Sequence, residues 1–93
     1  MIVPLTVSPE GTAMAMPDTL DGLQGDNVTF NCSSLGGPGN NFTWMRQNDG
    51  QIVGSEPQLT ITDLDAFDGG EYLCIVENSA GNDSTNVTLY SEL

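Results

Sequence analysis

The 93-residue sequence has no histidine and no lysine, and its only basic residue is Arg46. Without an imidazole or an amine, a nucleophile has almost no general base to pair with, so the composition argues against an enzyme. The same absence removes the nitrogen donors that most zinc and other transition-metal sites use. We therefore expect no catalytic residues, no cofactor-binding residues and no metal ligands.

Positive charge is almost entirely missing. Thirteen acidic residues and one basic residue give a formal net charge of −12 at pH 7. Nucleic acids and anionic membranes recruit proteins through cations, so nucleic acid is not an expected partner. The acidity has two interpretations, which the sequence leaves open: it favours a protein partner with a basic surface, or it only provides solubility.

Long apolar runs are also missing. No stretch approaches the roughly 18 apolar residues of a membrane-spanning helix, so we expect no direct membrane contact by this domain. Residues 1–5 lack the basic start and the long apolar core of a signal peptide. If the chain is secreted, we expect it to be a fragment of a longer cell-surface or secreted protein.

Cysteine is scarce, with only Cys32 and Cys74 present. The two are too far apart for a CxxC redox or zinc pair, so one structural disulfide is the simplest interpretation. A structural disulfide indicates an oxidising compartment, which favours an extracellular location. The length fits one domain, residues 1–93, whose small core benefits from a covalent link.

Hydrophobic alternation predicts short strands, and no segment has a convincing helical period. Each run has one apolar and one polar face, as two packed antiparallel sheets require. The predicted inward residues are Val28, Phe30, Cys32, Phe42, Trp44, Leu59, Ile61, Tyr72, Cys74, Val76, Val87 and Leu89.

The predicted core extends over about residues 23–90, after a first edge strand at residues 3–7 and an irregular lead-in to residue 22. Residues 14–17 within the lead-in are either a strand that switches between sheets or a loop. Residues 48–50 predict a hairpin turn after the Trp44 strand, and residues 80–83 predict the turn between the last two strands. Only one short strand, about residues 51–53, fits between Trp44 and Leu59.

The segment before Cys74 carries a family resemblance. Residues 68–74 read Asp-Gly-Gly-Glu-Tyr-Leu-Cys, which matches the signature D-x-G-x-Y-x-C at every defined position. Trp44 lies twelve residues after Cys32, and Leu64 lies four residues before Asp68. Over residues 23–89 the sequence resembles the immunoglobulin superfamily, in its short intermediate-set or second constant type.

The resemblance implies an all-β, immunoglobulin-like Greek-key sandwich of two antiparallel sheets with one inter-sheet disulfide. Cys32–Cys74 would be packed against Trp44, and the Tyr72 hydroxyl would bond back to the backbone as a tyrosine corner. Leu64 corresponds to the family's apolar plug. Because Arg46 is the only cation, Asp68 is expected to cap its own turn through backbone N–H groups.

Five N-glycosylation sequons, Asn-x-Ser/Thr, use five of the eight asparagines. Strand parity places these asparagines on solvent-facing surfaces or at turns, as a glycan requires. The alternative is that they are only polar residues on a β-surface. Sequons that end in threonine are the better glycan acceptors, so Asn27, Asn41 and Asn86 rank above Asn31 and Asn82, whose sequons end in serine.

Inward-pointing Tyr72, Cys74 and Val76 force Leu73 and Ile75 outward, and Met45 faces outward on the neighbouring strand. Our hypothesis is that Met45, Leu73 and Ile75 form a face that contacts a partner protein or a second copy. The alternative is that they are scattered exposed apolar residues, which are common. Outward Leu73 and Ile75 do not match the arginine used by sialic-acid-binding relatives.

An acidic turn invites a calcium interpretation, but its spacing does not follow an EF-hand loop. A solvated turn is the preferred interpretation of Asp63, Asp65, Asp68 and Glu71.

The leading functional prediction is an extracellular protein-binding module of an adhesion molecule or receptor, including the receptor tyrosine kinase type. Its binding is heterophilic or homophilic, and the inference rests on family analogy. The alternative is a structural spacer in a multi-domain stalk or matrix protein. An intracellular scaffold domain is disfavoured by the cysteines and the sequons.

Overall fold

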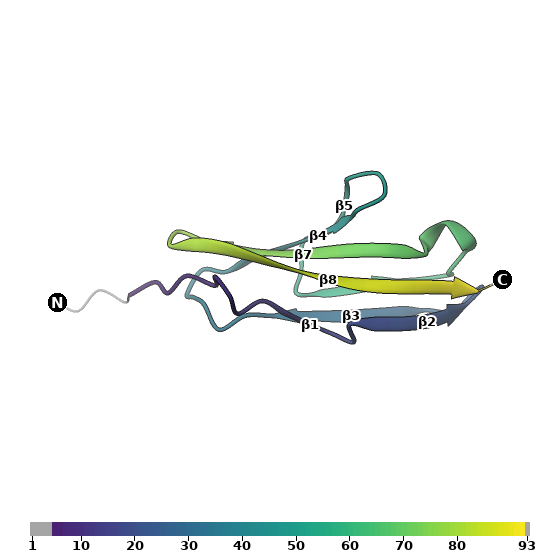
Figure 1. Cartoon of the computed structure of the whole chain (residues 1–93), viewed down its shortest axis with the longest axis horizontal. Helices are drawn as coiled ribbons and strands as arrows, with labels where there is room; N and C mark the ends of the chain where they lie inside the picture. The colour runs from purple at the N-terminus through teal and green to yellow at the C-terminus, as the bar shows by residue number, and fades with distance from the viewer. Residues whose placement is uncertain (1–4, 93) are drawn as a thin grey trace.

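The computed structural model describes residues 5–92, which form a sandwich of two β-sheets (Figure 1). The three-stranded sheet has the order β1 (Met14–Met16), β3 (Val28–Ser33) and β6 (Gln58–Ile61). The five-stranded sheet has the order β2 (Thr19–Leu23), β8 (Gly81–Glu92), β7 (Gly70–Asn78), β4 (Asn41–Arg46) and β5 (Gln51–Gly54). One 3-10 turn, η1 (Ala66–Asp68), precedes β7. The predicted all-β sandwich is confirmed.

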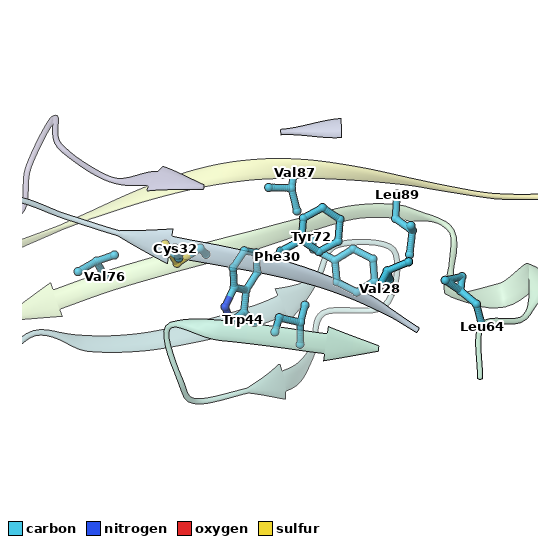
Figure 2. Close-up of a cluster of buried hydrophobic side chains, with 11 residues drawn as sticks. Val28, Phe30, Cys32, Trp44, Leu64, Tyr72, Val76, Val87 and Leu89 are labelled. Atoms are coloured by element: carbon cyan, nitrogen blue, oxygen red, sulfur yellow. A yellow bond between two sulfur atoms is a disulfide. The ribbon is translucent and has the colours of Figure 1, made fainter. Parts of the chain in front are cut away.

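The core lies between the sheets and consists of the inward side of each alternating strand (Figure 2). Phe30 packs between Trp44 and Tyr72, with ring centroids 6.2 and 6.4 Å away. Phe42 and Ile61 are only partly buried at its margin. The buried hydrophobic residues are Val28, Phe30, Cys32, Trp44, Leu59, Leu64, Tyr72, Cys74, Val76, Val87 and Leu89.

The disulfide joins the two layers of the sandwich. Cys32 on β3 and Cys74 on β7 are bonded across the sheets, with their Cα atoms 6.5 Å apart. Trp44 is fully buried, and its indole Nε1–H donates to the Pro57 carbonyl at 3.3 Å. That bond satisfies the one polar group of an otherwise apolar side chain.

The lead-in is more regular than the sequence predicted. β1 pairs antiparallel with β3, whereas β2 pairs in parallel with β8, so the chain changes sheets between Met16 and Thr19. The sheet-switching interpretation of residues 14–17 is therefore correct, and the description of the rest as irregular is wrong for Thr19–Leu23. Leu20 packs against the core and Gly22 is buried, but this short pattern is too weak to predict a strand.

One of the two predicted turns is displaced. The turn at residues 48–50 is confirmed, with Gly50 at a positive φ of 72°. The last hairpin instead turns at Ser79–Ala80, and residues 81–83 already belong to β8. The side chain of Asn78 stabilises this turn, because its Oδ1 accepts from the N–H groups of Ala80 and Gly81. The hydrogen bonds of Asn78, and not the glycine at position 81, therefore determine where the chain turns.

The first edge strand, predicted at residues 3–7, lies partly outside the described residues. In its described part, Val7 forms an isolated antiparallel bridge with Gly37 in the loop after β3. The β5 strand is the single short strand expected between Trp44 and Leu59. Residues 5–92 contain no helix long and apolar enough to cross a membrane.

Candidate functional site

The signature residues before Cys74 stabilise the turn that leads into β7. The Tyr72 hydroxyl donates to the Asp68 carbonyl, which is the tyrosine-corner geometry. Asp65 and Asp68 form a reciprocal cap: Asp65 Oδ1 accepts from the Phe67 N–H, and Asp68 Oδ2 accepts from the Asp65 N–H at 2.9 Å. Asp68 therefore caps its own turn. Burial raises the pKa of the Tyr72 phenol, and the nearby Asp68 carboxylate raises it further.

The acidic turn is arranged for backbone bonding. Two of its carboxylates accept backbone bonds: Asp65 from the Phe67 N–H of η1, and Asp68 from the N–H of Asp65, the residue that caps η1. Asp63 donates its own N–H to Asn27 Oδ1 across the turn at 3.1 Å. Among residues 5–92, no three acidic, cysteine or histidine side chains are grouped so that they could hold a metal ion.

The outer face of the five-stranded sheet carries a row of apolar side chains. Met45 on β4 lies opposite Leu73 on β7 and opposite Ile52 on β5. Paired residues point to the same side of a sheet, with their Cβ atoms about 5 Å apart. We call Ile52, Met45 and Leu73 the apolar row. Ile75 lies two residues further along β7, opposite Thr43, so the predicted face is contiguous.

Two residues of this surface were missed by the sequence analysis. Ile52 is 71% exposed, the most exposed apolar side chain on the five-stranded face. Its direction depends on a register shift between Trp44 and Met45, which alternation in β5 alone does not reveal. Gln47 extends from the end of β4 across β7, and its Nε2–H donates to Asn86 Oδ1 on β8 at 2.8 Å.

Three sequon asparagines share this face of the sheet. Asn86 on β8 lies directly opposite Leu73 and so continues the apolar row. Asn41 on β4 and Asn82 on β8 lie on either side of Glu77 on β7. Along each of these strands they are four residues from the line of Met45, Leu73 and Asn86. The other two lie elsewhere: Asn31 on β3 of the three-stranded sheet, and Asn27 in the turn before β3. All five side chains are exposed.

A family model described as immunoglobulin domain matches residues 8–78. The match covers both cysteines, Trp44 and the complete D-x-G-x-Y-x-C segment. The chain belongs to the immunoglobulin domain family. The intermediate-set subtype stays a prediction.

Relatives of this immunoglobulin domain include the rat cell surface glycoprotein MUC18, 33% identical over 52 residues, or 56% of this chain and 8% of that protein. A Xenopus laevis protein named cell adhesion molecule-related/down-regulated by oncogenes is 40% identical over 65 residues, or 62% of this chain and 5% of its own length. The crystal structure of the N-terminal four immunoglobulin domains of Dscam1 isoform 1.9 superimposes with a TM-score of 0.78. That match has 31% identity and covers 86% of this chain and 20% of that one. The chain thus spans a small part of each relative.

Asparagines of this immunoglobulin domain differ in which amide atom they use. Asn27, Asn31 and Asn86 each accept a hydrogen bond at Oδ1, and among the described residues their Nδ2 atoms donate none. Asn40 and Asn78, which belong to no sequon, donate from Nδ2 and are partly buried. A glycan is attached at Nδ2, and in these three sequon asparagines Nδ2 is not used in a hydrogen bond within residues 5–92.

The only cation of the domain is already paired. Arg46 lies 3.3 Å from the Asp49 carboxylate and also donates to Gln51 Oε1. The Gln51 N–H and the Arg46 guanidinium both lower the pKa of Asp49. The carboxylates elsewhere on the surface therefore have no cationic side chain of this chain to neutralise them, because the sequence contains no second basic residue.

Proposed function

We propose that this immunoglobulin domain is an extracellular protein-binding module of a cell-surface adhesion protein. We also propose that the apolar row and Ile75 are its contact surface. The observation that carries the proposal is the alignment of Ile52, Met45 and Leu73 across three neighbouring strands on a solvent-facing sheet. Burial of adjacent apolar side chains against a partner is favourable, and a contiguous set is more informative than scattered ones.

The extracellular location is supported by the disulfide and by the five exposed sequons. Two relatives are named as a cell surface glycoprotein and as cell adhesion molecule-related. These descriptions favour an adhesion protein over a receptor tyrosine kinase as the parent. Free-thiol counting is the direct check on the compartment, because two reactive thiols in the native secreted protein would contradict it.

Charge defines the chemistry of the partner. With a net charge of −12 and Arg46 already paired to Asp49, a second copy of this domain is repelled at long range. A partner that surrounds an apolar contact with lysine or arginine gains electrostatic complementarity instead. We therefore propose heterophilic binding to a basic protein surface.

The test compares single substitutions on different surfaces of the domain. An Fc-fused dimer of the domain, refolded from bacteria so that it carries no glycan, is applied to an array of purified extracellular protein domains, and hits are measured by surface plasmon resonance. Ile52→Glu is expected to weaken a specific hit by at least about tenfold, because a carboxylate enclosed in an apolar contact loses its hydration. The hit is also expected to weaken as salt is raised.

Met16→Glu is the matched control. Met16 is 66% exposed, close to the exposure of Ile52, but it lies on β1 of the other sheet. This variant is expected to bind like the wild type. Equal loss in both variants, or no hit that Ile52→Glu weakens, would contradict the proposed surface.

A structural spacer is the second candidate function, and the placement of the chain ends favours it. The N-terminal part of the described chain and the end of β8 lie at opposite ends of the sandwich (Figure 1). Leu35, in the loop bridged to Val7, is 84% exposed, and Phe67, in the η1 turn bonded to Ser91, is 85% exposed. Exposed apolar residues near both ends fit contacts with neighbouring domains.

The spacer function predicts a different mutational pattern. Phe67→Glu would loosen the contact with a neighbouring domain in the parent protein, whereas Ile52→Glu would have no effect. Small-angle X-ray scattering of the parent's tandem domains measures this as a broader distribution of interatomic distances. An unchanged distribution in Phe67→Glu would exclude the end-to-end contact.

A further inference from the structure

We infer that an N-linked glycan at Asn86 controls access to the apolar row, so that the chain glycosylated at Asn86 is the form that does not bind. The inference rests on the proposed function, because the row is the contact surface proposed above. The inference makes the two candidate functions two states of one domain. Without a glycan at Asn86 the apolar row is exposed and can bind a partner, and with the glycan the row is covered and the domain acts as a spacer.

Strand register places Asn86 in line with the row. The paired residues run from Ile52 on β5 through Met45 and Leu73 to Asn86 on β8. Neighbouring strands are about 4.8 Å apart, so Leu73 is one strand and Met45 two strands from the attachment point. A bulky sugar chain attached there lies beside the part of the row nearest β8.

The contacts of Asn86 in the folded domain are compatible with the modification. Its Oδ1 accepts from Gln47 Nε2, while among the described residues its Nδ2 donates to no other group. In the transfer, Nδ2 forms a bond to C1 of the sugar and loses a proton. The C1–O bond to a lipid-linked pyrophosphate donor breaks, and the lipid pyrophosphate leaves. The Gln47 bond involves the other amide atom and is compatible with the product.

Gln47 holds the amide of Asn86, and with it the attached glycan, in one orientation. Its side chain crosses β7 to reach Asn86, and that contact orients the amide plane of Asn86. We assign Gln47 as a positioning residue that limits the rotation of the asparagine side chain. A glycan on a fixed amide covers one area of the sheet, whereas a freely rotating one covers it only part of the time.

The remaining sequons are less suited to this role. Asn41 and Asn82 share the face but lie four residues from the row along their strands. Asn31 lies on the three-stranded sheet, where its Oδ1 accepts from Gln58. Removal of the Asn31 sequon by Ser33→Ala is therefore a matched control for removal of a glycan as such.

The test uses the chain secreted from mammalian cells, with Thr88 as the altered residue. Thr88→Ala destroys the Asn86 sequon, whereas Thr88→Ser keeps it, and both leave Asn86 and Gln47 in place. Peptide mass spectrometry measures the occupancy of Asn86. Hydroxyl-radical footprinting then measures the exposure of Met45 and Leu73, with Met14 and Met16 on β1 as internal references.

We expect Asn86 to be occupied in the wild type and in Thr88→Ser. The labelling of Met45 and Leu73, relative to Met14 and Met16, is expected to rise several-fold in Thr88→Ala and to stay unchanged in Ser33→Ala. Gln47→Ala is expected to keep the occupancy but to raise the labelling of Met45 partway. An unmodified Asn86, or equal labelling in Thr88→Ala and Thr88→Ser, would overturn the inference.

Footprinting needs no partner, so the two proposals fail separately. If Thr88→Ala exposes the apolar row but binds no array protein more tightly, the proposed contact surface is wrong. The conclusion that the Asn86 glycan covers the row is still correct in that case. If Ile52→Glu weakens a hit that Thr88→Ala and Thr88→Ser bind equally, the contact surface stands and the control by Asn86 is wrong.

Discussion

The Tyr72 hydroxyl connects β7 to the turn that precedes it. It donates to the Asp68 carbonyl, and Tyr72 itself is almost fully buried in the core. Tyr72→Phe removes the donor and is expected to lower the free energy of unfolding by about 1–2 kcal/mol, because a partly buried carbonyl loses its partner. Urea denaturation followed by tryptophan fluorescence measures the change.

Tyr90→Phe provides the comparison for Tyr72→Phe. Tyr90 is 54% exposed, so its hydroxyl remains solvated after folding. This variant is expected to unfold within experimental error of the wild type. If both variants lose the same stability, the tyrosine corner makes no special contribution.

Asp83 gives the domain a defined acid sensitivity. Its Oδ2 accepts from the Ala13 N–H at 2.8 Å, and this bond, with further N–H groups nearby, lowers the pKa of Asp83 below its ordinary value of 3.8. A carboxyl with a lowered pKa stabilises the fold above its ordinary pKa, and that stability is lost as the pH falls through the folded value. Asp83→Asn is therefore expected to be less stable at neutral pH.

The difference between Asp83→Asn and the wild type is expected to vanish well below pH 3.8, where both side chains are neutral. Urea midpoints at a series of pH values measure this convergence. Met14→Gln, an exposed change on β1, is the control. A constant offset at all pH values would show that the carboxylate charge at position 83 has no role.

At the scale of elements, the lead-in before β1 packs on the loop after β3. Pro9 is buried, and a Cβ added to Gly36 would lie only 2.6 Å from the backbone N and Cα of Pro9. Backbone atoms cannot move aside as a flexible side chain does. Gly36→Ala is therefore expected to cost about 1–3 kcal/mol of unfolding free energy and to separate the two segments.

Hydrogen exchange locates the effect of Gly36→Ala. The N–H groups of Val7 and Gly37, which bridge the two segments, are expected to exchange faster, while amides of β7 change less. Leu35→Ala, at a position 84% exposed, is the control and is expected to be neutral. Unchanged exchange at Val7 in Gly36→Ala would contradict the close packing.

At the scale of the whole molecule, the disulfide closes a loop with a sequence separation of 42, for which chain entropy gives about 4 kcal/mol of stabilisation. A domain of this size has a total stability of roughly 5–10 kcal/mol. The double variant Cys32→Ala, Cys74→Ala is therefore expected to lose a large share of it. Thermal and urea denaturation measure the loss.

Ser33→Ala, at an exposed position next to Cys32, is the control for mutation in this region. It is expected to change the urea midpoint little compared with the double cysteine variant. If the double variant unfolds at the wild-type midpoint, the core alone stabilises the sandwich and the entropic estimate does not apply.

Much of this fold could be predicted because its signals are local or strictly periodic. Alternation with a period of two assigns Phe30, Cys74 and Val87 to the core, since a strand turns each successive side chain to the opposite face. The spacing of Cys32 and Cys74 indicates the disulfide by simple chemistry. The D-x-G-x-Y-x-C segment indicates the turn before β7, because each of its positions has its own hydrogen-bonding or packing role.

Register and contacts between distant segments could be decided only by the tertiary structure. Thr19–Leu23 becomes a strand because β8 offers a free edge for parallel pairing, and no pattern within five residues encodes that partner. Ile52 reaches the apolar row only after the register shift beside Met45. Alternation in the sequence by itself determined that Met45, Leu73 and Asn86 face outward, whereas the pairing of strands determined that Asn86 lies next to Leu73, because neighbours across a sheet are set by hydrogen-bond register and not by position along the chain.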